Sequence, residues 1–288
     1  MSSRRWGAEA GLSFLEPRFS AGAHTLVKLV SPAYLRYGEG VRDVIVHGEE
    51  ALVSEFAEFF EGATRLIVAF RHPSVSDAPL LGYLFASKLP RIARRNGRPL
   101  ARRSLVHFLY GRGVPVWAGK PVGWLLPGIA AIPVYHRRLD STGMGAVRDA
   151  ALNGRFPLAL APEGQVTYHN KTFGDLEAGT GRIAMWCRND LQKAGRDEHV
   201  RILPLSLEYR YPDGGADVLE RVLEWISYKT GIEADFDPKA AAPREIRRGL
   251  LSLTEALLSR IEGMYETGFA SPDGAAGPEP GGPEPSGQ

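Results

Sequence analysis

The chain alternates short apolar runs with amphipathic segments between residues 43 and 230. Short runs rich in Val, Ile, Leu and Phe are typical of buried strands, whereas apolar residues at helical spacing indicate helices. The pattern predicts strands over residues 43–48, 65–70, 106–110, 129–134, 156–161 and 201–207. It predicts helices over residues 49–61, 142–153, 176–194 and 217–228, and another that begins soon after Asp77. Because the two kinds of element alternate, we expect an α/β fold with a single mixed, largely parallel sheet flanked by helices.

Two further helices and a tail flank this alternation. Residues 24–37 form an N-terminal amphipathic segment, and residues 243–265 form a C-terminal helix with an apolar stripe. From Gly268 onward the chain is rich in Gly, Pro, Glu and Ser and has no apolar face, as in disordered segments. We therefore divide the chain into an N-terminal arm with an amphipathic helix (1–42), an α/β domain (43–266) and a disordered tail (267–288). The amphipathic helix either packs on the core or lies at a membrane interface.

Composition adds little to this picture, whereas the distribution of charge adds more. The 288 residues carry a formal net charge of +2, and 44% of them are hydrophobic, as in ordinary globular proteins. Between Arg91 and Arg103 there are six arginines and no acidic residue. Such a run is commonly a solvated face. The alternative is a surface that meets the phosphates of anionic lipid, a nucleotide or nucleic acid.

No stretch of the sequence suits a bilayer span. The longest uncharged stretch, residues 121–135, is interrupted by prolines and is shorter than the about 20 apolar residues that a span needs. Residues 1–5 lack the apolar core of a secretory signal. The single cysteine, Cys187, excludes an internal disulfide and favours a reducing compartment. We therefore expect a cytoplasmic protein, peripheral on the inner face of the membrane.

Polar residues of types that serve in catalysis or ligand binding follow three of the predicted strands. They are His72 with Asp77, Arg137 with Arg138, and Glu163 with Gly164. Because the carboxyl ends of parallel strands gather at one edge of a sheet, we expect these residues to lie near one another. A His beside a carboxylate is the simplest general-base unit, since the carboxylate orients the ring and stabilises the imidazolium. The alternative for this pair is a surface turn in which Asp77 caps the next helix.

In its order of motifs the chain resembles the glycerolipid acyltransferases, which include the 1-acylglycerol-3-phosphate and lysophospholipid acyltransferases. The matching motifs, in chain order, are a His-x4-Asp pair at His72 and Asp77, a strand ending in arginine over residues 128–137, the run Ala161-Pro162-Glu163-Gly164, a Gly-containing helix start over residues 176–184, and a strand with a central proline at Ile202-Leu203-Pro204-Leu205. The resemblance covers about residues 43 to 210.

The resemblance implies direct transfer of a fatty acyl group from acyl-CoA or acyl carrier protein to a hydroxyl of a glycerolipid or lysophospholipid, in phospholipid biosynthesis. It implies that His72 is the general base, that Asp77 orients it, and that no acyl-enzyme forms. The residues that it implies for the acceptor are Arg137, Arg138, Glu163, Gly164 and Pro204. It implies no bound cofactor beyond the co-substrate, and as partners a thioester, a lysolipid and an anionic membrane surface. Nucleic acid is not among them, and the oligomeric state stays open.

The sequence departs from the family pattern near the acceptor. Gln165 and Val166 stand where the family has Thr and Arg, and the family uses that Arg on the acceptor's phosphate. The second motif carries one extra residue, so that either Arg137 or Arg138 takes the family's position. An acceptor other than a glycerol phosphate therefore remains an alternative, as does an inactive lipid-binding protein. A dinucleotide site at the Gly-x-Gly-x-x-Ala run, residues 179–184, lacks the preceding strand that such a site requires.

Overall fold

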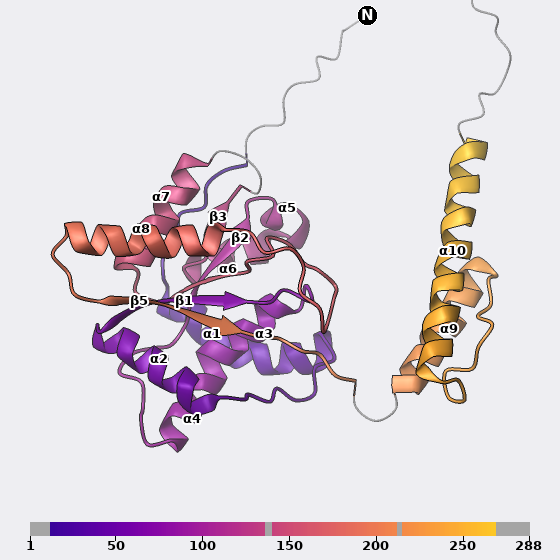
Figure 1. Ribbon diagram of the computed structural model, residues 1–288, viewed down its shortest axis with the longest axis horizontal. Coiled ribbons are helices and arrows are strands. Elements are labelled where there is room, and N and C mark those ends of the chain that lie inside the picture. The colour runs from indigo at the N-terminus through magenta and orange to yellow at the C-terminus, as the bar shows by residue number, and fades with distance from the viewer. Residues whose placement is uncertain (1–11, 136–139, 212–214, 269–288) are drawn as a thin grey trace, which may run out of the picture. The chain divides into compact units, whose positions relative to one another are not determined.

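The computed structural model describes residues 12–135, 140–211 and 215–268, and it divides the chain into two compact units, Met1–Tyr209 and Arg210–Gln288 (Figure 1). The boundary between the two units falls after Tyr209, within the range 43–266 that the sequence indicated as one domain. Beyond residue 268, the tail predicted to be disordered lies outside the described residues, as do the first eleven residues of the arm.

The first unit is built on a sheet of five strands. They are β1 (Thr64–Phe70), β2 (His107–Gly111), β3 (Ile132–Val134), β4 (Leu158–Leu160) and β5 (His199–Leu205), in the order β3-β2-β4-β1-β5. Every pairing between the described strands is parallel, so the prediction of an α/β fold is confirmed. The described sheet is parallel throughout rather than mixed. β1 is buried along nearly its whole length, which explains its continuous apolar run.

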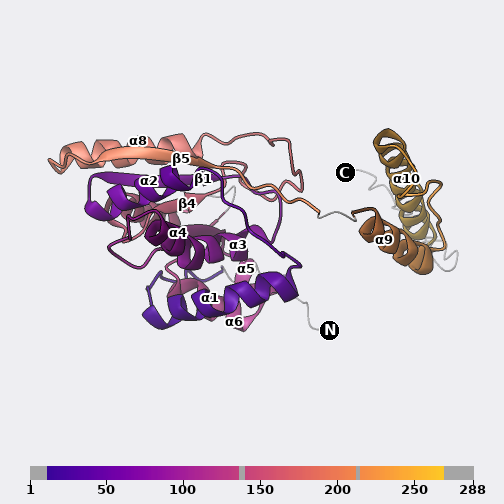
Figure 2. The same ribbon diagram turned by 90° about the horizontal axis from the view of Figure 1, so that it is seen from below.

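Helices cover both faces of this sheet (Figures 1 and 2). The helical segments of the unit are α1 (Ala21–Ala33), η1 (Tyr34–Gly38), α2 (Glu49–Glu61), α3 (Asp77–Tyr83), η2 (Leu84–Lys88), α4 (Leu89–Arg95), α5 (Val114–Ala118), α6 (Lys120–Gly128), α7 (Ser141–Asn153) and α8 (Gly179–Lys193). Residues of α7 and α8 form the core on one face, and residues of α2, α3, η2 and α4 form the larger core on the other.

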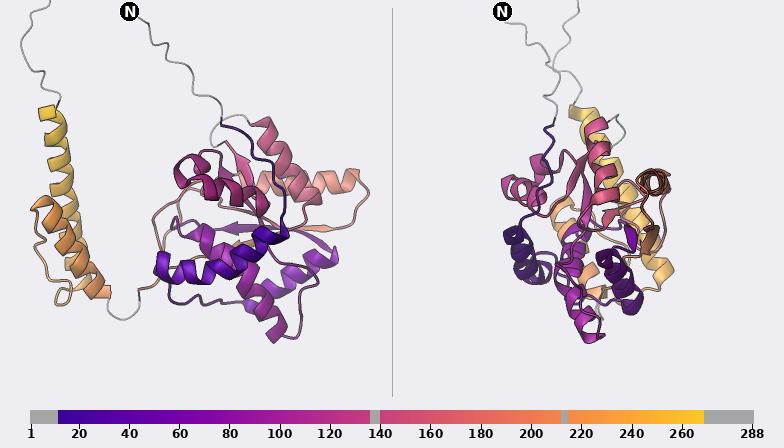
Figure 3. Two further views of the ribbon diagram at one scale, coloured as in Figure 1. Left: turned by 180° about the vertical axis from the view of Figure 1, so that it is seen from behind. Right: turned by 90° about the vertical axis from the view of Figure 1, so that its left-hand side faces the viewer.

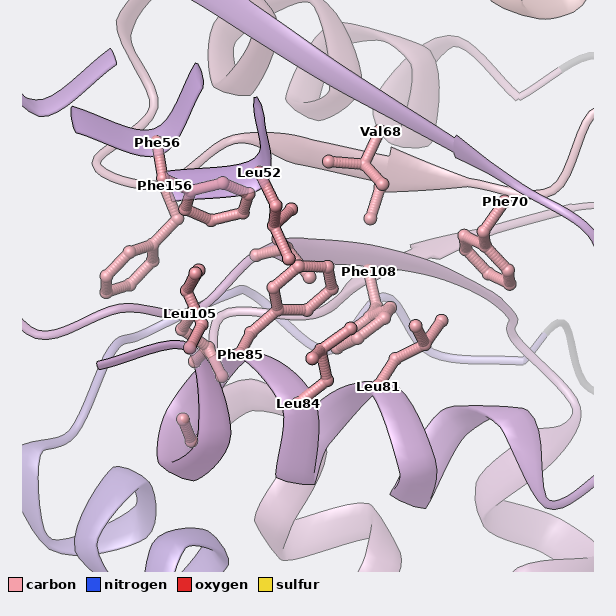
Figure 4. Packing of buried hydrophobic residues seen from close by; sticks show 14 of the residues in the cluster. Leu52, Phe56, Val68, Phe70, Leu81, Leu84, Phe85, Leu105, Phe108 and Phe156 are labelled. Carbon is pink, nitrogen blue, oxygen red and sulfur yellow. The ribbon is translucent and has the colours of Figure 1, made fainter. Parts of the chain in front are cut away.

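Phenylalanine and aliphatic side chains interdigitate in the larger core (Figure 4). Phe56 of α2 stacks on Phe85 of η2 with ring centroids 5.2 Å apart, and both side chains are fully buried. Phe108 of β2 contacts Phe85 and Phe70 from the sheet. Phe70 is the last residue of β1, so this packing fixes the point at which the chain leaves the sheet.

Two parts of the sequence prediction were wrong or incomplete. Residues 43–48 form no strand; Val44 and Val46 pack against the larger core from an irregular segment, while Ile45 is exposed. Their β-branched composition favours extended backbone, but these residues pair with no strand of the described sheet. The pattern also did not predict the helices α5 and α6 within residues 114–128. Each of these helices has a proline in its first turn, a position that helices tolerate.

The second unit is a helical hairpin of α9 (Gly215–Thr230) and α10 (Pro243–Gly268), which lie side by side (Figure 3). Leu223 of α9 and Leu253 of α10 are its buried apolar residues. The connecting segment packs Phe236 against Gly249, where a Cβ would lie 2.1 Å from the ring. Lys239 pairs with Glu220 at 2.7 Å. These contacts make the hairpin a unit of its own.

None of the helices in the described ranges is both long and apolar enough to cross a membrane.

Candidate active site

The turn after β1 brings the His72 and Asp77 side chains together, so their expected proximity is confirmed. Nδ1 of His72 lies 2.8 Å from Oδ2 of Asp77. The N–H of Ser74 donates to the same oxygen at 3.0 Å, which folds the turn around the carboxylate. Asp77 is the first residue of α3, where the helix dipole favours a negative charge.

Tyr209 completes a chain of three side chains with this pair. Asp77 is 0% exposed, and its second oxygen, Oδ1, accepts a hydrogen bond from the Tyr209 hydroxyl at 2.5 Å. Burial raises the pKa of Tyr209, and the hydrogen bond to Asp77 adds to the shift, so the phenol stays protonated and donates. Asn170 fixes the Tyr209 backbone by accepting from its N–H at 2.7 Å and donating to its carbonyl at 2.6 Å. The buried carboxylate thus has three donors.

One nitrogen of His72 remains free for chemistry. A carboxylate only accepts hydrogen bonds, so Nδ1 of His72 donates to Asp77, and in the neutral ring Nε2 then carries the lone pair. Nε2 makes no hydrogen bond to any described residue, and the side chain is 23% exposed. Phe70 packs on the ring at 5.8 Å between centroids and limits its rotation. The arrangement therefore presents an oriented base to the solvent.

Glu163 holds the backbone of the His72 turn. It follows β4 in a turn where Gly164 has a φ of +69°, a conformation that favours glycine. Oε2 of Glu163 accepts from the N–H of His72 at 2.8 Å, and Oε1 accepts from the N–H of Gly174 at 3.1 Å. The carboxylate is buried and both its oxygens have backbone donors. Glu163 therefore positions the base, and its expected contact with an acceptor stays a prediction.

Arg71 attaches a further part of the loop between β4 and α8 to the same turn. Its buried guanidinium donates to the carbonyls of Asn170 at 3.0 Å, His169 at 2.9 Å and Thr172 at 2.5 Å. The N–H of Thr167 donates to the carbonyl of His72 at 2.9 Å. Residues 167–172 are thus fixed to the turn, although they belong to no helix or strand.

The sequence patterns did not point to Arg71, Asn170 or Tyr209 as members of this site. Arg71 adjoins His72 in the sequence, and that adjacency was the available signal for it. Asn170 and Tyr209 lie far along the chain, in segments without periodicity.

A further arginine lies at the same edge of the sheet but is neutralised. His107 of β2 and Ile67 of β1 both align with Leu158 of β4, and Arg112 and His72 each follow the carboxyl end of their strand. Arg112 pairs with Asp140 at 2.5 Å and stacks on the Tyr135 ring. Its charge is thereby already balanced.

The remaining predicted acceptor residues are Pro204, Arg137 and Arg138. Pro204 aligns with Ala69 on the edge strand β5 and is exposed, a place where its missing N–H costs no sheet hydrogen bond. Arg137 and Arg138 follow β3 but lie outside the described residues. A metal is not supported by the described ranges, because they contain no group of three or more His, Cys, Asp or Glu able to hold one.

Several arginines of the run between Arg91 and Arg103 have protein partners. Arg95 pairs with Glu49 and Arg98 with Glu61, both on α2, while Arg103 donates to the carbonyl of Ala21 at 3.4 Å. This part of the surface is therefore less available to anionic lipid than the sequence alone indicated.

Comparisons with known proteins identified no relative of this chain. The chain matches no protein-family model. Neither the search of curated proteins nor the search of solved structures found a match.

Proposed function

We propose that this protein is an O-acyltransferase that moves a fatty acyl group from acyl-CoA or acyl carrier protein to a hydroxyl of a glycerolipid or lysophospholipid. The observation that carries the proposal is the oriented His72, whose Nδ1 is held by the buried Asp77 and whose Nε2 is free at the carboxyl edge of a parallel sheet. The order of motifs along the chain supports the same reaction class.

In the proposed reaction Nε2 of His72 takes the proton of the acceptor hydroxyl while the oxygen attacks the thioester carbonyl carbon. The C–S bond then breaks, the acyl group stays on the acceptor oxygen, and the leaving thiolate takes the proton back from the imidazolium. Asp77 stabilises the imidazolium through the bond at 2.8 Å. No step uses a serine or cysteine nucleophile.

The amide of Val75 is the proposed donor to the oxyanion. Within residues 71–77, the other amides have acceptors, and Pro73 has no N–H. The Val75 N–H makes no hydrogen bond to a described residue, and its side chain is exposed. A backbone donor left free beside the base suits the negative charge that develops on the carbonyl oxygen.

The reaction is tested by mixing the protein with acyl-CoA and a panel of lysolipids, with and without a phosphate, and following release of free thiol. We expect thiol release that depends on one class of acceptor. Absence of release with every acceptor, and with acyl carrier protein as the donor, would instead favour a lipid-binding protein without catalysis.

The role of His72 is tested by His72→Ala, with His199→Ala as the matched control because that histidine is exposed on the edge strand. Removal of a general base lowers a rate by about 10²–10⁴-fold. We expect a loss of this size for His72→Ala at unchanged circular dichroism, and wild-type turnover for the control. Near wild-type turnover of His72→Ala would contradict the assignment.

A surface of α1, η1, α5 and α6 supports the proposed membrane partner. Its exposed apolar residues include Tyr37 at 83%, Trp117 at 74%, Leu29 at 70% and Trp124 at 64% exposure. Residues 21–38 and 113–135 contain basic residues but no acidic residue. α1 contacts α6, and α5 packs on α6, so the helices that carry these exposed side chains adjoin one another (Figure 2). Aromatic side chains with basic neighbours suit the interface of an anionic membrane.

This surface adjoins the candidate active site. α1 contacts α3, which begins at Asp77. Glu39, which follows η1, accepts a hydrogen bond from the Ser76 hydroxyl at 2.5 Å. A lipid acceptor in the membrane would therefore approach near the His72 turn.

The surface is tested by sedimentation with vesicles that contain or lack anionic lipid. We expect binding that requires anionic lipid and weakens with salt, and that falls at least about 10-fold in Trp117→Ser/Trp124→Ser because two interfacial anchors are lost. Met185→Ser, at an exposed apolar position on α8, is the control. Equal binding by the double variant and the wild type would contradict the proposal.

A further inference from the structure

A pocket of about 500 Å³ lies at the edge of the sheet opposite the candidate active site. Its walls come from segments that precede strands or end helices: the end of α2, the start of β1, the loop before β2, the turn between α7 and β4, and the loop before β5. We call it the arginine pocket, after its lining residues Arg65, Arg102, Arg155 and Arg196. β1 spans seven residues, so roughly 20 Å of strand separates the pocket from His72.

The pocket carries more positive charge than its own carboxylates neutralise. Its two acidic residues are already engaged: Glu198 accepts from Arg196 at 3.0 Å, and Glu61 accepts from Arg98, which is outside the lining, at 3.3 Å. No carboxylate of the described chain pairs with Arg102 or Arg155. Two guanidinium groups at the pocket thus have no counter-charge.

A third cation of the pocket, Arg65, lies in the wall and forms no ion pair with a described carboxylate. Its side chain is buried, stacks on the Phe59 ring at 4.9 Å, and donates to the carbonyls of Ala151 at 2.8 Å and Gly154 at 2.9 Å. Carbonyls at the end of α7 fix the guanidinium but supply only partial charges. Burial lowers the pKa of Arg65, because the charged guanidinium is taken out of water.

The Arg155 side chain is also held in a fixed orientation. Its guanidinium stacks on the Phe19 ring at 4.6 Å and lies 5.7 Å from the Phe156 ring. Stacking orients a guanidinium while leaving its N–H groups able to donate. The pocket therefore combines concavity, fixed donors and excess positive charge, which is the combination that binds multivalent oxyanions.

We propose that the arginine pocket binds a ligand with a diphosphate or phosphate monoester group, through Arg102 and Arg155 with Arg65 in the wall. The volume exceeds that of phosphate alone, so the ligand has a further part of small-metabolite or headgroup size. The site is separate from the proposed acyl transfer, and its ligand occupies the opposite edge of the sheet.

The proposal is tested by calorimetric titration of the full chain with inorganic diphosphate and, separately, with inorganic phosphate at low salt. We expect diphosphate to bind more tightly than phosphate, and the affinity to fall at least about 10-fold in Arg102→Gln/Arg155→Gln. Arg91→Gln is the control, because Arg91 is an exposed arginine of α4 outside the pocket. A second arm uses vesicles that carry phosphatidic acid, and it distinguishes a lipid phosphate from a soluble one.

Two outcomes would overturn the proposal: no binding of diphosphate at millimolar concentration, or equal affinity of the double variant and the wild type. Circular dichroism of the double variant establishes that it is folded, and Arg102→Gln alone, at an exposed loop position, should still weaken binding if folding of the double variant fails. We expect His72→Ala to bind diphosphate with wild-type affinity. That result would show that the pocket is independent of the proposed catalytic function, which the thiol-release assay tests separately.

Discussion

Tyr209 shows how a single residue can reach the site from far along the chain. It lies 132 positions after Asp77, beyond the end of β5, yet its hydroxyl donates to the buried carboxylate. The His-x4-Asp spacing predicted the contact between His72 and Asp77 because a short turn joins them. No local pattern marks Tyr209, since its place depends on where β5 pairs with β1.

We expect Tyr209→Phe to weaken both the fold and the proposed reaction. A buried carboxylate oxygen that loses its donor costs about 1–3 kcal/mol, which urea unfolding would measure. Without this donor the carboxylate holds the imidazolium more strongly, so the acid limb of the rate profile should move to higher pH. Tyr211→Phe is the control, because Tyr211 is exposed. Unchanged stability and an unchanged profile would count against a positioning role.

At the scale of elements, buried histidines fix α1 and β2 in place. Nε2 of His24, on α1, donates to the carbonyl of Ser104 at 3.1 Å. Nδ1 of His107 donates to the carbonyl of Ala130 at 2.8 Å, and its Nε2 accepts from the N–H of Phe156 at 3.4 Å. Burial lowers the pKa of both histidines, although the carbonyl contacts oppose the shift.

The depressed pKa values predict a stability that falls as the pH falls. The histidines of the unfolded chain gain protons near pH 6.5, whereas the folded chain resists protonation, so stability is full above about 6.5 and is lost below it. We expect the free energy of unfolding, measured in urea between pH 8 and pH 5, to fall less steeply in His24→Gln, whose amide can still donate to Ser104. The exposed His199→Gln is the matched control. An equal slope in His24→Gln and the wild type would contradict this account.

The sequence predicted the sheet-forming runs and most of the helices because burial dictates their periodicity. It failed at residues 43–48 and over α5 and α6, where apolar composition does not decide whether an edge strand, a coil or a short helix forms. It paired His72 with Asp77 correctly, but it did not predict that both oxygens of Glu163 accept hydrogen bonds from backbone amides. Such partners come from loops whose paths are set by the tertiary fold.

At the scale of the whole molecule, the division at Tyr209 has a direct consequence. The hydrogen bonds described for the candidate site join residues between Arg71 and Tyr209, all in the first unit. The second unit buries Leu223 and Leu253 within its own hairpin.

We therefore expect a chain that ends at Tyr211 to keep the first unit folded. Its thermal unfolding should remain a single transition by circular dichroism, and any thiol release should persist at the rate of the whole chain. The His72→Ala change introduced into the shortened chain is the control for that activity. Loss of cooperative unfolding on shortening would show that the two units depend on each other.

The loop between β4 and α8 is held to the His72 turn at three places: by Glu163, by the amide of Thr167 and by the guanidinium of Arg71. Because none of these attachments can open without disturbing the others, the loop and the turn should fluctuate as one cooperative unit. Amide hydrogen exchange would then report one common opening free energy for the N–H groups of His72, Thr167 and Gly174. Each such opening would also free the backbone of His72, so we expect the lifetime of the closed loop to limit how long the proposed base keeps its orientation.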